Sequence, residues 1–350
     1  MEKLWNIYCA EQPDFIAEIA KSPELERLKD VGMNCGCEYT SFSFFKKIER
    51  YSRFEHSVGV ALITWNFTKD IRQTIAALLH DISTPVFAHV VDFLRGDHLK
   101  QEATEEQTKE FIASSAHIMA ALDRLGVDIE EVCDYHKYPI ADNDTPGLSA
   151  DRLEYTLGNI VNFGFGSKEL VAELYSDITV TTNEKGEKEL AFRHIEKAVT
   201  FAQLSLKCSI VYVCDEDRYA MQMLAELLGR EIAAADIDAA DLYLTERQII
   251  DKICVTEKGR AEWDRFCSYS HILTCKKGEC ESLKDSQAFL QHNDLEFREI
   301  RAKKRYIDPI VAIAEYDKAE IARVSELSPL YRDELNIFLQ SPQDYLVAGY

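Results

Sequence analysis

Through most of this chain, apolar residues recur three and four positions apart, the spacing that places them on one face of an α-helix. The pattern is clearest in five segments, residues 71–82, 105–125, 150–161, 194–213 and 217–235. Helices with apolar faces bury them against one another, so the core should be built from packed helices. We therefore predict a mainly α fold.

One segment departs from the helical spacing. Residues 178–182 (ITVTT) are rich in β-branched side chains, residues 188–192 (KELAF) alternate, and a turn-like stretch around Gly186 separates them. This pattern predicts a small β-hairpin near residues 178–192. A weaker pattern indicates short strands at residues 37–45.

The chain has few signals of a domain boundary. Its 350 residues include only 14 glycines and 8 prolines, and no Pro/Ser-rich linker divides them. The polar stretch KKGECESLKDSQ, residues 276–287, is the clearest soft boundary. We predict one main domain over residues 1–230 and a C-terminal helical extension, residues 231–350, packed on it.

The charge balance limits the classes of partner. There are 61 acidic against 40 basic residues, a formal net charge of −21. Such a surface repels phosphate backbones and anionic lipid, so we expect no broad nucleic-acid binding and no membrane binding. A small anionic substrate remains compatible, because a metal and a few basic groups can dominate the field inside a pocket.

The first residues, MEKLWNIYCAEQPDF, lack the features of a signal peptide, and no apolar run approaches the ~18 residues of a membrane span. We therefore expect a cytoplasmic protein. In that setting the ten scattered cysteines are expected to be reduced thiols, and none forms a CxxC…CxxC set with zinc spacing.

Four residues in three helical segments carry the chemistry: His56, the adjacent His80 and Asp81, and Asp151. Two imidazoles and two carboxylates suit one divalent ion, which could be Fe, Mn, Mg, Co, Ni or Zn. Adjacent helical residues do not face the same way, so the other two ligands must come from neighbouring helices of a bundle.

A dication with open positions can bind a phosphate oxygen and lower the pKa of water to about 7, which suits phosphoester hydrolysis. The alternative is that these residues are ordinary buried polar groups or ion pairs. A histidine followed by an aspartate is weak evidence by itself, since the pair also arises by chance.

Three pieces, RFEHSVGVA, AALLHDISTPVFAH and SADRLEYT, follow one another along the chain. Together they resemble HD-domain metal-dependent phosphohydrolases, and within them the deoxynucleoside triphosphate triphosphohydrolase-like (dGTPase-like) branch. Weaker similarity covers residues 25 to about 310. The resemblance implies an HD-domain helical bundle, a homodimer, and metal ligation by His56, His80, Asp81 and Asp151.

The resemblance also places Arg53 and Tyr155 beside the substrate. Arg53 lies three residues before His56 and suits a phosphate; a surface salt bridge is the less favoured alternative. Tyr155 lies four residues after Asp151, on the same helical face, and could contact a sugar or serve as a core tyrosine.

Other substrate-side positions are mixed. Tyr212 matches a family tyrosine, whereas Asn159 stands where an aspartate is expected. Leu204 or Ser205 stands where an arginine would bind phosphate. Losing a bidentate donor should weaken the binding of a triphosphate in particular.

The motif around the His–Asp pair departs from the branch it resembles, in which the pattern is similar to HDIGHGPFSH. Here it is HDISTPVFAH, so Ser83 and Thr84 replace the glycine and histidine, while His89 matches the last histidine. The usual later His–Glu pair has no clear counterpart beyond His98 or residues 101–102. Candidates for general acid–base catalysis are His98, Glu102, His89 and His117.

These observations favour a metal-dependent phosphohydrolase acting on a nucleotide or another small phosphoester. The alternative is a catalytically weak or inactive HD-fold protein that binds metal or nucleotide and has a regulatory or partner-binding role. A purely structural helical protein, without stoichiometric metal, is a third reading.

Overall fold

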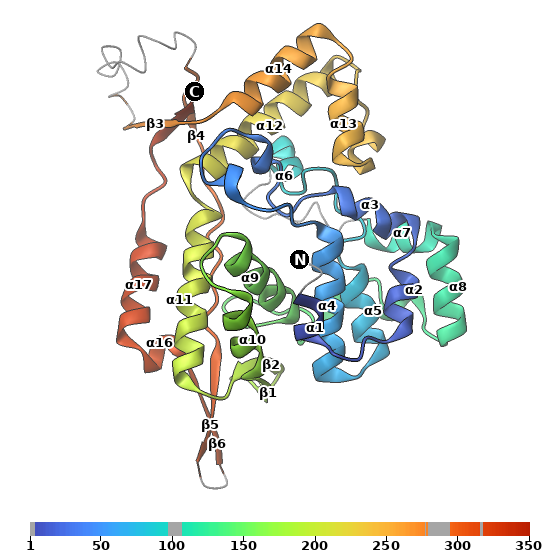
Figure 1. Cartoon of the computed structure of the whole chain (residues 1–350), viewed down its shortest axis with the longest axis vertical. Helices are drawn as coiled ribbons and strands as arrows, with labels where there is room; N and C mark the ends of the chain where they lie inside the picture. The colour runs from blue at the N-terminus through green and yellow to red at the C-terminus, as the bar shows by residue number, and fades with distance from the viewer. Residues whose placement is uncertain (1–3, 97–106, 277, 279–294, 316–317) are drawn as a thin grey trace.

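The structure is a computed structural model that describes residues 4–96, 107–276, 278, 295–315 and 318–350. Helices dominate it, as the sequence predicts (Figure 1). The first ten α-helices are α1 (Trp5–Tyr8), α2 (Asp14–Ile19), α3 (Pro23–Arg27), α4 (Arg53–Thr68), α5 (Ile71–Leu79), α6 (Val90–Arg95), α7 (Thr108–Ser114), α8 (Ala116–Leu125), α9 (Ala150–Asn162) and α10 (Lys168–Ser176). Later in the chain come α11 (Ile195–Val211), α12 (Asp215–Ala233), α13 (Glu246–Ile253), α14 (Glu257–Ser268), α16 (Val324–Leu327) and α17 (Pro329–Gln340).

Helix α4 is central to the part of the fold that carries the site. It packs against both α5 and α9, and its residues from Val58 to Thr64 are buried without a break (Figure 1). Its start is fixed by a capping box: the Ser52 hydroxyl accepts from the Glu55 amide at 3.2 Å, and the Glu55 carboxylate accepts from the Ser52 amide at 2.9 Å. The first turn of α4 is therefore held in place at both its backbone and its side chains.

The predicted hairpin is confirmed. Strands β1 (Ile178–Thr182) and β2 (Lys188–Phe192) pair antiparallel. They belong to a four-stranded sheet of order β1-β2-β5-β6, in which β5 (Ile310–Glu315) runs parallel to β2 and antiparallel to β6 (Lys318–Arg323). Strands β5 and β6 extend together away from the helices (Figure 1).

Two expectations about strands are wrong. Residues 37–45 contain no strand: they hold a 3-10 turn at Cys37–Tyr39 and the start of another at Phe45–Lys47, since the side chains here pack between helices rather than along a sheet. Residues 231–350 are not a purely helical extension, because they also supply β5, β6 and the three-stranded sheet of β3 (Ile272–Cys275), β7 (Leu346–Gly349) and β4 (Arg298–Glu299).

The C-terminal residues share an apolar cluster with earlier parts of the chain. Tyr219 and Leu224 of α12 belong to the same buried cluster as Phe42, Trp263 and Val347. The second cluster is larger and lies around α4, α5 and α9. Residues on both sides of position 230 thus contribute to one core, and the proposed division there stays a prediction.

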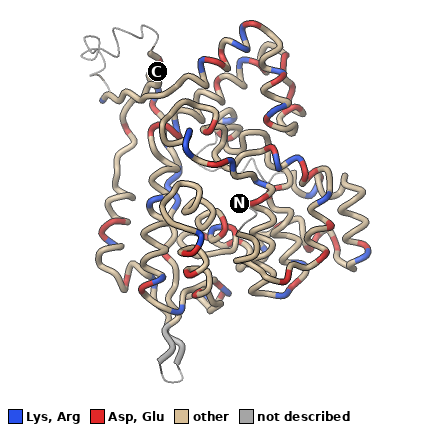
Figure 2. The backbone as a smooth tube through the Cα atoms, in the orientation of Figure 1, with Lys and Arg blue, Asp and Glu red and all other residues tan. Residues whose placement is uncertain are grey.

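Charged residues of both signs are interspersed along most of the elements (Figure 2). No single helix in the described part of the chain is long and apolar enough to cross a membrane; α11 and α12, bent by 44° at their junction, pass that test only as a pair.

Cys275, at the end of β3, is disulfide-bonded, whereas eight other cysteines are free. The expectation of reduced thiols throughout is wrong at Cys275, because a compositional argument does not constrain the surroundings of one cysteine.

Candidate metal centre

The first turn of α4 brings His56 between two carboxylates of α9. His56 Nε2 lies 3.0 Å from Asp151 Oδ1, and His56 Nδ1 lies 2.6 Å from Glu154 Oε2. Asp151 and Glu154 are three residues apart near the start of α9, which Ser149 caps, so both side chains face α4. Each nitrogen of the buried imidazole therefore has its own carboxylate partner.

His80 directly follows the last residue of α5. Its Nδ1 lies 2.7 Å from the carbonyl oxygen of Ala77. A carbonyl only accepts, so Nδ1 carries the proton and donates it, and Nε2 is left to act as a ligand. This nitrogen lies 3.8 Å from Asp151 Oδ1. The end of α5 thus orients the second imidazole toward the first.

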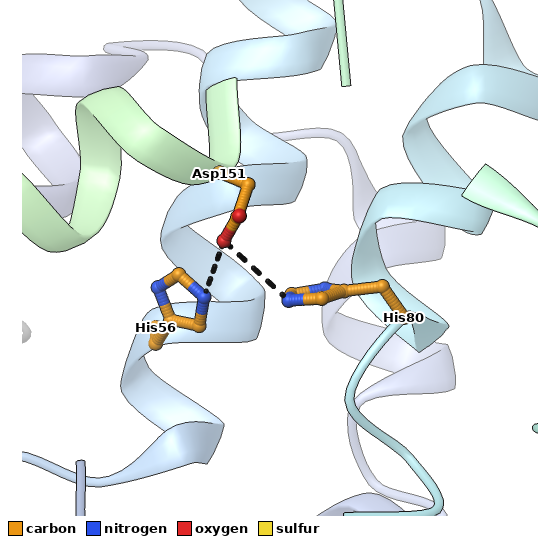
Figure 3. Close-up of side chains that lie close together, drawn as sticks. All are labelled: His56, His80 and Asp151. Atoms are coloured by element: carbon orange, nitrogen blue, oxygen red, sulfur yellow. Dashed lines mark ion pairs between the residues drawn. The ribbon is translucent and has the colours of Figure 1, made fainter. Parts of the chain in front are cut away.

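His56, His80 and Asp151 meet at one point although they come from three helical segments (Figure 3). One ligand atom from each lies within 4.8 Å of the others, and both imidazoles present Nε2 to the Asp151 carboxylate (Figure 3). Two imidazole nitrogens and a carboxylate oxygen suit a divalent ion, and each imidazole is held by a further partner, Glu154 or the Ala77 carbonyl. The residues present therefore fit a metal ion.

Asp81, the fourth predicted ligand, lies at the edge of this cluster. Its Oδ2 is 3.6 Å from His80 Nε2, but Arg53 Nη1 donates to both carboxylate oxygens at 3.0 and 2.8 Å, and the Thr84 hydroxyl donates at 2.8 Å. Burial alone would raise the pKa of Asp81, yet the positive charges of Arg53, His80 and His56 and the Thr84 hydrogen bond together outweigh burial and hold the pKa well below its usual range. Asp81 is therefore ionised, and a buried arginine accompanies it.

Glu154 is the residue that the sequence interpretation missed in this cluster. It is 2% exposed, accepts from the Tyr51 hydroxyl as well as contacting His56, and lies so close to Gly59 that a side chain there would collide with it. Its position three residues after Asp151 was the available signal, because residues at that spacing share a helical face.

The charge of His56 follows from these partners. Burial by itself lowers the pKa of His56, but the hydrogen bonds to Asp151 and Glu154 outweigh it and raise the pKa to about 10. The imidazole is thus positively charged at neutral pH in this structure. A divalent ion at the same place would supply that positive charge, and its binding would release the proton.

A cavity of about 1050 Å³, open solvent included, adjoins the cluster. Its lining includes all four predicted metal ligands and every predicted substrate-side residue, namely Arg53, Tyr155, Asn159 and Tyr212. Asn159 Nδ2 donates to the Tyr212 hydroxyl at 2.7 Å, and the rings of Tyr155 and Tyr212 lie edge to face with centroids 6.2 Å apart. Tyr155, Asn159 and Tyr212 therefore lie together in the cavity lining, whereas Arg53 lies against Asp81.

The candidates for acid–base catalysis separate in space. His89 lines the cavity, and its Nδ1 lies 2.9 Å from Asp92 Oδ2; burial lowers its pKa, so the imidazole is neutral at neutral pH. His117 lies on α8, away from the cavity lining, with its Nε2 2.8 Å from the Glu18 carbonyl oxygen. His98 and Glu102 lie outside the described residues.

The two substitutions in the His–Asp motif are buried. The Ser83 hydroxyl lies 3.0 Å from that of Thr108, while the Thr84 hydroxyl donates to Asp81. Leu204 and Ser205, which stand where the resemblance expects an arginine, are buried in α11 and do not line the cavity.

Cationic groups instead reach the cavity from an unexpected place. Lys303 and Arg305, from the segment between β4 and β5, line its wall. The cluster of basic residues at 301–305, in a chain of net charge −21, was the signal available in the sequence. No local pattern, however, tells which cavity such a segment will border.

Asp217 of α12 lines another part of the same cavity. It is buried, and the Cys37 thiol donates to its Oδ1 at 3.5 Å. Burial raises the pKa of Asp217 to about 8. The cavity is thus bordered by a carboxyl group that is largely neutral at pH 7, in contrast to the ionised Asp81.

Comparison with known proteins agrees with the geometry. The chain is 27% identical over 149 residues to metal-dependent phosphohydrolase cns2 of Cordyceps militaris, which covers 43% of this chain and 41% of that protein. It is 26% identical over 240 residues to the uncharacterized protein YdhJ of Bacillus subtilis, covering 67% and 70% of the two chains. The chain spans less than half the length of the fungal relative. No protein-family model matches it.

Among solved structures, a phosphohydrolase of Bacteroides thetaiotaomicron superposes with a TM-score of 0.62 at 15% identity, covering 95% of each chain. At this identity the likeness shows a shared fold. The chain thus has a metal-dependent phosphohydrolase among its relatives, the fold of a phosphohydrolase, and a three-residue cluster suited to a metal.

Proposed function

We propose that the protein is an HD-type metal-dependent phosphohydrolase that acts on a nucleotide or another small phosphoester. The observation that carries the proposal is the convergence of His56, His80 and Asp151 beside a cavity large enough for such a substrate. The relationship to a metal-dependent phosphohydrolase supports it. Membership of the dGTPase-like branch is part of the proposal and rests on the three sequence motifs.

His56, His80 and Asp151 would hold one divalent ion, with Asp81 as the fourth ligand; Fe, Mn, Mg, Co, Ni and Zn all suit the donor set. A bound ion supplies Lewis-acid polarisation of a phosphoryl oxygen and a lowered pKa for an attacking water. Glu154 keeps the His56 ring in orientation, and the Ala77 carbonyl does the same for His80.

The other residues of the cavity bind substrate in this proposal. Arg53 brings its positive charge to the edge of the metal cluster, where it lies against Asp81 and faces the phosphate. Tyr155, Tyr212 and Asn159 contact the remainder of a nucleotide. His89 is the described candidate for proton transfer, because it is neutral and lines the cavity.

The test combines metal analysis with phosphate release. Protein purified without chelator is analysed for metal, then assayed on nucleoside mono-, di- and triphosphates with Mn, Mg or Fe. Near-stoichiometric metal and turnover of one substrate class are expected, and both should be lost in His80→Gln. Turnover that persists undiminished in metal-free His80→Gln protein would overturn the proposed mechanism.

A second function is favoured by the hydroxyl groups at Ser83 and Thr84. Both are buried and bonded to other residues, so neither replaces the imidazole that the resembling branch carries. The protein would then bind metal and nucleotide with little or no turnover and act in regulation or partner binding. It predicts stoichiometric metal, thermal stabilisation by nucleotide and no phosphate release.

Two further proposals concern the setting of the protein. We propose a homodimer, as the resemblance implies, and a cytoplasmic location. Light scattering coupled to size-exclusion chromatography tests the first, and a monomer at micromolar concentration would contradict it. Fractionation of cells that express the tagged chain tests the second.

A further inference from the structure

The segment between β4 and β5 sends neighbouring side chains in different directions. Lys304 donates to the carbonyl oxygens of Phe338, Leu339 and Ser341 at 2.8, 2.8 and 2.6 Å, at the end of α17. The residues on either side of it, Lys303 and Arg305, line the cavity next to the metal cluster. One lysine thus fastens the segment to the fold, while its two neighbours supply positive charge to the site.

The segment is held at several points of its backbone. The Ala302 amide donates to the Gln343 side chain at 2.9 Å, the Tyr331 hydroxyl donates to the Ile307 carbonyl at 2.5 Å, and the Asp308 amide donates to the Pro146 carbonyl at 3.0 Å. The backbone that carries the two cations is therefore bonded on both sides of them, as a rigid binding site requires.

Arg305 is electrostatically coupled to three groups of the site. Burial raises the pKa of Tyr155 and Tyr212 and lowers that of His89, and the positive charge of Arg305 is a smaller influence that acts downward on all three. These three side chains come from different parts of the fold, and each lines the cavity. Arg305 therefore faces the same space as the predicted substrate-side residues.

The charges around the cavity divide into two groups. Arg53 is bound to Asp81, and this pair belongs to the metal cluster. The other arginine and lysine side chains that line the cavity in the described part of the chain are Arg305 and Lys303. The resemblance places a phosphate-binding arginine at residue 204 or 205, but Leu204 and Ser205 do not line the cavity. Lys303 and Arg305 bring positive charge to the cavity lining instead.

We propose that Lys303 and Arg305 form an anion-binding arm that selects substrates carrying a dianionic phosphomonoester group. The proposal deepens the phosphohydrolase function proposed above and rests on it for the identity of the ligand. A phosphomonoester carries a charge of about −1.5 to −2 at pH 7, whereas a diester carries one negative charge. Two cations match the first better, and an arginine can bind it through two parallel hydrogen bonds.

The remainder of the cavity suits the esterified group. Phe45, Phe163, Val211 and Met221 give it apolar walls. A phosphomonoester whose alcohol carries a ring or another apolar group would place its phosphate between the metal cluster and the arm, and the apolar group against these side chains.

The experiment compares Arg305→Gln and Lys303→Gln with the control Arg301→Gln, which removes an exposed cation of the same segment that pairs with Glu299 and does not line the cavity. Binding of inorganic phosphate to the metal-loaded proteins is measured by calorimetry. Hydrolysis is measured in parallel on p-nitrophenyl phosphate, a monoester, and bis(p-nitrophenyl) phosphate, a diester. Both esters release the same leaving group, p-nitrophenolate. Metal content and circular dichroism check each variant for integrity.

Loss of Arg305 should weaken phosphate binding on the order of tenfold or more, since hydrogen bonds to charged groups are the strong ones. The ratio of kcat/KM for the monoester to kcat/KM for the diester should fall by a similar factor, because the KM for the monoester should rise. Lys303→Gln should show a smaller loss and Arg301→Gln none. Arg305→Lys, which keeps the charge but not the two parallel bonds, should lie between wild type and Arg305→Gln.

The outcomes distinguish a failure of the proposed anion-binding arm from a failure of the proposed phosphohydrolase function. Phosphate binding that depends on Arg305, without turnover of any ester, supports the arm and contradicts the hydrolase. Turnover with an unchanged monoester preference in folded, metal-loaded Arg305→Gln overturns the arm and leaves the hydrolase standing. If Arg305→Gln fails to fold, Arg305→Lys and Lys303→Gln decide, and wild-type affinity and preference in both would overturn the arm.

Discussion

Two groups of residues that line the cavity, which we call its metal end and its cationic end, are built in different ways. The metal end consists of His56, His80 and Asp151, which lie on or directly after the packed helices α4, α5 and α9. The other end is bordered by Lys303 and Arg305, from a segment without helix or strand. In the proposed function, metal binding therefore depends on a helical bundle, whereas the choice of substrate depends on a segment late in the chain.

The electrostatic character of the two ends differs as well. The metal end is anionic, with Asp151, Glu154 and the ionised Asp81 around one imidazolium and one guanidinium. The other end brings two cations, Lys303 and Arg305. This difference indicates that changes at the two ends should be separable: one set alters metal content, and the other alters substrate affinity.

The largest effect on metal binding is expected from Asp151→Asn. The amide keeps the shape but loses the charge that contacts both imidazoles. We expect loss of stoichiometric metal and a fall in kcat on the order of 10³-fold, because a catalytic ion supplies several kcal/mol of charge stabilisation. Metal analysis and phosphate release measure the two effects. Asp144→Asn, at an exposed aspartate before α9, is the control, and full metal content in Asp151→Asn would contradict the assignment.

A smaller effect at the same end is expected from Glu154→Gln. Glu154 contacts the far nitrogen of His56 and not the point where the three ligands meet. Removing such a supporting carboxylate typically costs about 10–100-fold in metal affinity or activity. Titration with a competing chelator measures the affinity, and Glu169→Gln, on the exposed start of α10, is the control. Unchanged metal affinity would mean that Glu154 only balances the charge of His56.

The contrast between the two ends also explains how much could be predicted from the sequence. The metal residues lie in contiguous motifs on helices, where a spacing of three or four residues fixes which side chains share a face. The hairpin at residues 178–192 was equally local and was predicted to the residue. Glu154 was within reach of the same rule, since it follows Asp151 by three positions.

The remaining features depend on contacts between distant parts of the chain. Strand β5 joins the β1–β2 hairpin because Ile310 and Val311 pair with Ala191 and Phe192, and no local alternation identifies a partner so far away. Likewise, Lys303 and Arg305 reach the cavity because Lys304 is bonded to the end of α17. Local periodicity cannot carry such information, so the sequence predicted the metal end and not the opposite one.

Asp217, a buried residue of the cavity lining outside both of these groups, offers a third test, through the dependence of stability on pH. Burial raises its pKa to about 8, so the native protein holds this proton between roughly pH 4 and 8, where the unfolded chain has lost it. Stability should therefore fall as pH rises through this window, by up to about 1.4 kcal/mol per pH unit from this group. Asp217→Asn, which cannot ionise, should remove that slope and be relatively more stable at pH 8 than at pH 5.

Chemical unfolding of wild type and Asp217→Asn at several pH values between 5 and 8 measures this difference. Asp236→Asn, at an exposed aspartate just after α12, is the matched control and should keep the wild-type slope. Metal content should stay the same in all three proteins, because Asp217 does not belong to the group of residues that suits a metal ion. Parallel stability curves for wild type and Asp217→Asn would show that the Asp217 carboxyl group is ionised in the native protein.

The smallest expected effect, that of Tyr212→Phe, tests whether Tyr212 contributes to substrate binding or to the reaction at the metal. Tyr212→Phe removes the acceptor for Asn159 Nδ2, and Asn159 Oδ1 has no other hydrogen-bond partner within the described residues. Losing one such bond costs about 0.5–1.5 kcal/mol, so KM should rise a few-fold while kcat and metal content stay unchanged. Tyr138→Phe, which loses a similar bond to the Glu131 carbonyl away from the cavity, is the control. A fall in kcat at constant KM would instead place Tyr212 beside the reacting phosphate.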